Sequence, residues 1–94
     1  MVVSLTGEFD LATAGALGSV LSRLLEHARC LVIDVSAVSF LDYAGLRPLL
    51  TAAATAARRQ VEVTLRGQSP ALGRLVTAMD RAGLARPALL ARVA

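Results

Sequence analysis

Apolar and polar residues recur along the chain with two different periods, which separates the expected strands from the expected helices. Residues 2–6 and 61–65 alternate between apolar and polar side chains, as in strands that expose one face to solvent. Gly7 and Glu8 are expected to end the first of these strands. Residues 30–35 are apolar at every position but the fifth, which is typical of a central strand covered on both faces.

Between the expected strands, apolar residues recur every three or four positions, as on one face of a helix. The three stripes are Leu17, Val20, Leu21, Leu24, Leu25 and Ala28; then Leu46, Leu49, Leu50, Ala53, Ala54 and Ala57, with Thr51, Thr55 and Arg58 on the outer face; and finally Leu72, Leu75, Val76 and Met79. The first helix is expected to begin between Asp10 and Thr13, either of which can cap it. The third begins at Ser69 and Pro70 and stops at Gly83.

The start of the second helix is the least regular part of the pattern. Asp42 can cap this helix by accepting a hydrogen bond from a free backbone N–H of its first turn. Pro48 has no N–H, so a helix that began directly after Asp42 would leave the Ala44 carbonyl without its helical partner. We therefore expect the regular helix to start near Leu46 or Arg47, or to be irregular in its first turn.

Alternation of three strands with three helices predicts an α/β fold with parallel strands joined by right-handed crossovers. A chain of 94 residues has room for one small domain, which we assign to residues 1–94. Residues 84–94 are expected to form a short terminal turn or helix that closes the core. In a parallel sheet, the first two strand-to-helix turns emerge at the same edge.

Composition narrows the possible functions. The formal charge is +3, but all ten basic residues are arginines scattered along the chain, and the aromatic residues are only Phe9, Phe40 and Tyr43. This pattern argues against direct nucleic-acid binding, which uses basic stripes and stacking platforms. No apolar stretch approaches the roughly 20 residues that cross a bilayer, so no membrane insertion is expected. A single cysteine excludes an internal disulfide and favours a reducing cytoplasm.

The chain also lacks the residues of common catalytic sites. One histidine and one cysteine cannot supply a Ser-His-Asp or Cys-His set, and no phosphate-binding glycine loop occurs. We interpret Cys30 as a small buried hydrophobe and His27 as a solvated residue near a helix end, without a second ligand for a metal. Of Glu8 and Asp10, one is interpreted as a helix cap and the other as an exposed carboxylate, or both as contacts for arginines of a partner. The sequence therefore predicts a protein that is not an enzyme and has no metal or cofactor.

Two short segments resemble the motifs of the STAS family, which includes the bacterial anti-sigma-factor antagonists. They are Gly7-Glu8-Phe9-Asp10 and, after the central strand, Asp42-Tyr43-Ala44-Gly45. The resemblance implies a small, mostly parallel sheet with alternating helices, in a family that usually has an additional N-terminal strand. In many members the hydroxyl residue before the glycine is phosphorylated by the partner kinase. Ala44 occupies that position here, so the usual phosphoacceptor is missing.

The resemblance implies a function in partner binding. The chain would dock onto an anti-sigma factor of the histidine-kinase-like ATPase type and release a sigma factor. The implied partner surface is Glu8, Asp10, Ser39, Asp42, Tyr43, Ala44, Gly45, Leu46 and Arg47. Two alternatives are a STAS subunit that holds the ATPase of an ABC-type lipid-transport complex, and a small-ligand-sensing module. The particular sigma factor, the regulating signal and the oligomeric state stay open.

Several junction residues have structural interpretations beside the functional one. Asp42 can act as a cap alone, and Gly45 can serve only to let two backbone segments approach closely. Tyr43 either packs against the domain or is offered to a partner. Ser36 and Ser39 are alternative phosphate acceptors, although serines beside a loop more often bond to nearby backbone.

Overall fold

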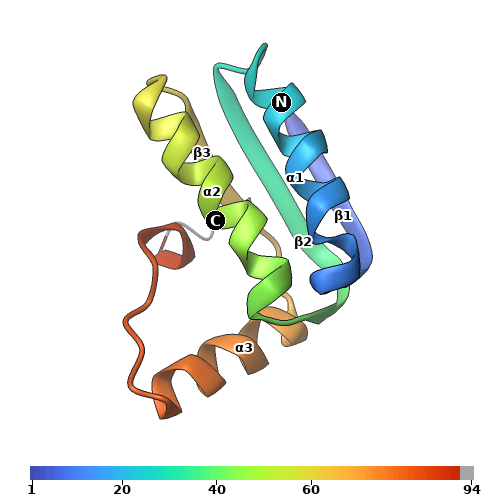
Figure 1. Cartoon of the computed structure of the whole chain (residues 1–94), viewed down its shortest axis with the longest axis vertical. Helices are drawn as coiled ribbons and strands as arrows, with labels where there is room; N and C mark the ends of the chain where they lie inside the picture. Colours follow the sequence, from blue (N-terminus) through green and yellow to red (C-terminus); the bar gives the residue numbers. More distant parts are fainter. Residues whose placement is uncertain (92–94) are drawn as a thin grey trace.

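The computed structural model, which describes residues 1–91, contains a three-stranded sheet in the order β1-β2-β3 with both pairs parallel. The elements in chain order are β1 (Val2–Phe9), α1 (Leu11–Leu25), β2 (Cys30–Leu41), α2 (Tyr43–Arg58), β3 (Glu62–Arg66), α3 (Pro70–Arg81) and the short 3-10 helix η1 (Ala88–Ala91). This arrangement confirms the predicted α/β class and the predicted order of elements (Figure 1).

Helices α1 and α2 lie side by side over one face of the sheet (Figure 1). The core between these helices and the sheet consists of the inward side chains of the three strands and the apolar stripes of the helices. Its largest fully buried members are Leu21, Leu31, Ile33, Leu46, Leu49, Leu65, Val35 and Val63. Helix α3 packs near the end of β2 at which both strand-to-helix turns lie, so it borders the same edge of the domain (Figure 1).

Strands β1 and β2 are longer than the sequence pattern predicts, whereas β3 has the expected length. Gly7 and Glu8 do not end β1, which continues to Phe9 and stays paired with β2 as far as Leu41. The pairing register shifts between Gly7 and Glu8, where Gly7 has a φ of 98° that other residues rarely adopt. This irregularity lets β1 bend without leaving the sheet, and a periodicity argument cannot detect it.

The prediction that both faces of β2 are covered is wrong. Leu31 and Ile33 are fully buried, but Val32 and Asp34 on the other face are half-buried, and Cys30 is exposed rather than a buried hydrophobe. On that second face Asp34 accepts hydrogen bonds from the guanidinium of Arg66 on the neighbouring strand β3, and both side chains stay partly exposed to solvent.

Helix α2 also departs from the expectation. It begins at Tyr43 rather than near Leu46, because the Asp42 cap starts the turn and the Leu46 N–H already donates to the Asp42 carbonyl. Pro48 therefore lies inside the helix. On its buried face, Leu46 and Leu49 are joined by Ala52 and Ala56, whereas the expected Ala54 and Ala57 are exposed.

The C-terminal segment closes the domain as expected. Gly83 adopts a φ of 74° after α3 and ends that helix, and η1 then brings the side chain of Leu89 into the core with 4% exposure. Residues 92–94 of the predicted terminal segment lie outside the described residues. None of the helices described in residues 1–91 is both long and apolar enough to cross a membrane.

Candidate partner-binding site

The two strand-to-helix turns predicted to share one edge of the sheet are in direct contact. The Asp42 N–H donates to the Phe9 carbonyl at 3.4 Å, which links the end of β2 to the end of β1. Gly45 in the first turn of α2 packs so closely that a Cβ atom there would lie 2.1 Å from the Phe9 oxygen. Gly45 therefore has the structural role considered for it, which is to let two backbone segments approach closely, because only a glycine fits against this backbone.

Each turn is completed by an aspartate cap. Asp10 Oδ1 accepts hydrogen bonds from the Ala12 and Thr13 N–H groups at 3.0 and 3.2 Å, and the Thr13 hydroxyl accepts one from the Asp10 N–H. Asp42 Oδ1 accepts from the Gly45 N–H at 2.9 Å. Both predicted caps are confirmed, and both carboxylates are held by backbone donors of the helices that they start.

Several of the expected surface residues come together on this edge with exposed side chains. Tyr43 is 50% exposed at the first position of α2, so of its two interpretations the structure favours a ring that is open to solvent over one packed fully against the domain. Arg47 is exposed one turn later, Ala44 is half-buried between them, and Glu8 is exposed at the end of β1. Ala44 and Arg47 line one pocket together, and the exposed side chains of Glu8, Tyr43 and Arg47 are open to a partner.

Other expected residues play different parts. Leu46 is fully buried and Gly45 is buried, so they shape this surface from beneath and present no side chain to a partner. Ser39 is exposed on β2 rather than in a loop. The hydroxyl of Ser36 donates to Asp34 Oδ1 at 2.7 Å, so this serine bonds to a neighbouring side chain on the second face of the sheet.

Sequence reasoning missed two exposed apolar side chains at the edge. Leu11, the first residue of α1, is 81% exposed, and Phe40 near the end of β2 is 45% exposed. Singly exposed apolar residues need no explanation, but these two lie at the strand-to-helix turns: Leu11 borders a pocket with Ala44, and Phe40 borders another with Asp42. Extending the alternation of buried Leu31, Ile33 and Val35 along a longer β2 would have placed Phe40 on the face of the sheet opposite these residues.

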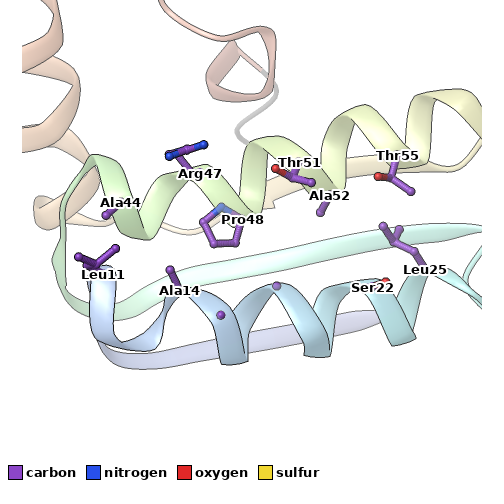
Figure 2. A pocket seen from close by; sticks show the side chains of 12 residues that line it. Leu11, Ala14, Ser22, Leu25, Ala44, Arg47, Pro48, Thr51, Ala52 and Thr55 are labelled. Carbon is purple, nitrogen blue, oxygen red and sulfur yellow. The ribbon is translucent and has the colours of Figure 1, made fainter.

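A groove runs away from this edge between α1 and α2, with a volume of about 390 Å³. Leu11 and Ala44 lie at one end of it and Leu25 and Thr55 at the other (Figure 2). Its lining is mainly apolar and includes Gly15 from α1. Thr55 was expected on the solvent face of α2, but it borders this groove, as Thr51 does.

The carboxyl with the largest shift in pKa lies away from the edge. Hydrogen bonds from the Ser36 hydroxyl and backbone N–H, together with the Arg66 guanidinium, lower the pKa of Asp34 to about 2. Arg86 likewise lowers the pKa of Asp80 at the C-terminal segment. Both are structural ion pairs, and neither belongs to a cluster of possible metal ligands, since residues 1–91 contain no such cluster.

The chain is thus a small α/β domain with an exposed surface at its strand-to-helix turns. A family profile described as "Mlab, STAS domain" matches residues 1–91, and the chain therefore belongs to the STAS domain family. This result confirms the family that the two sequence motifs indicated. None of the curated proteins compared with the chain matches it.

Several solved structures resemble the chain. An anti-sigma factor antagonist from Mycobacterium paratuberculosis is 35% identical, with a TM-score of 0.65 over 86% of this chain and 71% of that chain. A sulfate transporter family protein from Wolinella succinogenes is 23% identical, with a TM-score of 0.70 over 98% and 73%. The SulP transporter STAS domain from Vibrio cholerae is 22% identical, with a TM-score of 0.61 over 98% and 70%. The last two likenesses concern the fold alone.

Proposed function

We propose that this domain is an anti-sigma-factor antagonist that works by binding, without control by phosphate at residue 44. It docks the edge formed by the two strand-to-helix turns onto a histidine-kinase-like anti-sigma factor in the cytoplasm, and the sigma factor is released. The observation that carries the proposal is the first turn of α2, where Tyr43 and Arg47 are exposed and Ala44 stands between them. The 35% identity to an anti-sigma factor antagonist supports it.

The chemistry of the edge suits protein binding. Tyr43 offers a large rigid ring, which is a frequent anchor in protein interfaces, and Arg47 offers a cation that can pair with an acidic group. The backbone beneath is fixed by the caps and by the contact between Gly45 and Phe9, so little order has to be gained on binding. Such a surface recognises a protein and does not need a catalytic group.

The proposed lack of a switch follows from the position of Ala44. A phosphate at this position would add about −1.5 to −2 charges to the middle of the surface and would disrupt an interface packed against it. Alanine has no oxygen to phosphorylate, so this brake is missing. The antagonist is then active whenever it is present, and its control lies in its amount or in another partner.

The test compares Ala44→Asp with Ala54→Asp in calorimetric titrations against the purified cognate anti-sigma factor of the histidine-kinase-like type. Ala44→Asp should weaken binding more than ten-fold, about 1.4 kcal/mol. An acidic residue in the first turn of a helix is favourable to the helix dipole, and melting curves of both variants verify that the fold is retained. Ala54 is exposed on the same helix but far from the edge, so Ala54→Asp should bind like the native protein. Equal affinity of both variants contradicts the proposed surface.

A second arm of the same test restores the switch. Ala44→Ser places a hydroxyl at the phosphoacceptor position, and incubation with the anti-sigma kinase and ATP should label this variant but not the native protein. Mass spectrometry of the digested protein locates the phosphate. A phosphate on the native chain at Ser39 or Tyr43 would show that this edge is still switched, which contradicts the constitutive part of the proposal.

A second candidate is a STAS subunit that holds the ATPase of a lipid-transport complex. The specific observation in its favour is again Ala44, because a permanent subunit has no use for a phosphate switch. The matching family profile is described as "Mlab, STAS domain", and this description does not mention an anti-sigma factor antagonist. Stoichiometric co-purification with an ATPase subunit, and no binding to any kinase-like anti-sigma factor, would favour this candidate over the first.

A further inference from the structure

We infer that the groove between α1 and α2 is the seat of an amphipathic helix of the partner protein, with an acidic side chain opposite Arg47. This inference rests on the proposed function for the identity of the partner. It adds a second contact region to the edge, because Ala44 and Arg47 belong both to the edge and to the groove. The partner would then contact the ends of the two helices and the trough between them.

The shape of the groove fits a helix. Its lining on α1 recurs every three or four residues from Leu11 to Leu25, which is the full length of a helix that spans about 20 Å at 1.5 Å per residue. On α2 the lining runs from Ala44 to Thr55 in the same way. The result is an elongated trough between two helices that start at the same end, as Figure 2 shows.

Two glycines of α1, Gly15 and Gly18, line the trough. A Cβ atom at Gly15 would meet nothing within 4 Å, and one at Gly18 would meet only the ring of Pro48 at 3.9 Å. Small residues of this kind let another backbone approach closely, as an entering helix requires. The hydroxyls of Thr51 and Thr55 stand along the α2 wall, where they can bond to polar groups of a peptide.

The charge of the lining selects the occupant. Arg47 is the charged residue that lines the groove, it is exposed, and it makes none of the ion pairs found in residues 1–91. A carboxylate on the docked helix would give it a partner in a mainly apolar setting, where exposed apolar Leu11 also gains cover. An amphipathic helix with apolar anchors and one acidic position supplies both contacts.

A groove-filling substitution tests the inference without harm to the fold. Gly15→Leu places a side chain in the trough, and leucine is a better helix former than glycine, so this variant should be at least as stable as the native protein. The matched control is Gly73→Leu on α3, which is also exposed, helical and free of atoms within 4 Å of its Cβ position. Melting curves of both variants verify that the fold is retained.

The probe is a synthetic amphipathic peptide of about 14 residues, a length that matches the trough, with a leucine stripe and glutamates near one end. Its binding is followed by amide chemical shifts of the labelled protein. We expect shifts at Gly15, Gly18 and Thr55, an affinity at least ten-fold weaker for Gly15→Leu, and no change for Gly73→Leu. The Arg47→Glu variant should bind a second peptide, in which lysines replace the glutamates, more tightly than it binds the glutamate peptide.

Each other outcome contradicts the inference. Absence of shifts in the groove, or equal binding by Gly15→Leu, removes the groove as a docking site. Shifts caused by dodecanoate but not by the peptide would assign the groove to an acyl chain, and shifts that appear with rising protein concentration alone would assign it to a second copy. The result is independent of the anti-sigma titrations: Ala44→Asp can abolish partner binding while Gly15→Leu retains it, which would refute only the groove.

Discussion

At the scale of single residues, Gly45 joins the two strand-to-helix turns through its contact with the Phe9 carbonyl. We predict that Gly45→Ala lowers the free energy of unfolding by about 1–3 kcal/mol, the usual cost of forcing an extra carbon into a packed site. Gly15→Ala is the control, since it meets no atom within 4 Å and should stabilise α1 by about 0.5–1 kcal/mol. Urea unfolding measures both changes, and equal stability of the two variants would contradict the contact.

The Asp34 carboxylate makes the free energy of unfolding depend on pH in the acidic range. Its pKa is lowered from 3.8 to about 2 by the Ser36 hydrogen bonds and by Arg66, so the folded state favours its charged form. This contribution is fully present above pH 3.8 and is lost as the pH falls through 2. We predict that Asp34→Asn flattens the fall in stability over that window, as measured by urea unfolding at stepped pH. A native slope in the variant would assign the acid sensitivity to other carboxyls.

At the scale of secondary-structure elements, the Asp10 cap determines where α1 begins. We predict that Asp10→Ala lowers the free energy of unfolding by about 1 kcal/mol, because two backbone donors lose their acceptor. Asp10→Asn should retain the stability, since asparagine caps equally well. The same pair separates structure from recognition: partner binding that falls in the asparagine variant would show that the charge of Asp10 is read by the partner, whereas equal stability of all three proteins would contradict the capping role.

At the scale of the whole molecule, the segment after α3 closes the core through one side chain. Leu89 is 4% exposed and packs with the buried cluster, so Leu89→Ala should cost about 2–5 kcal/mol and lower the melting temperature by more than 8 °C. Arg86→Ala breaks the exposed ion pair with Asp80 in the same segment and should leave the melting temperature nearly unchanged. The reverse order of effects would mean that the ion pair, and not burial, holds the segment.

The sequence by itself determined the elements and the caps. Period and capping chemistry are local properties, so the alternation of strands and helices, the Asp10 and Ser69 caps and the stop at Gly83 could be predicted. The two motifs also indicated the STAS family and showed that Ala44 lacks a hydroxyl, because these statements depend only on which residue stands at which position.

Only the tertiary structure decided how these elements meet. The length of β1 past Gly7 depends on pairing with β2, and the start of α2 at Tyr43 depends on a cap and a packed turn that outweigh the missing N–H of Pro48. The exposure of Cys30 and the groove lined by Thr55 depend on which faces other segments cover. Local patterns specify which side of an element is apolar, but contacts between residues distant in the sequence decide what is buried and which surface is left open to a partner.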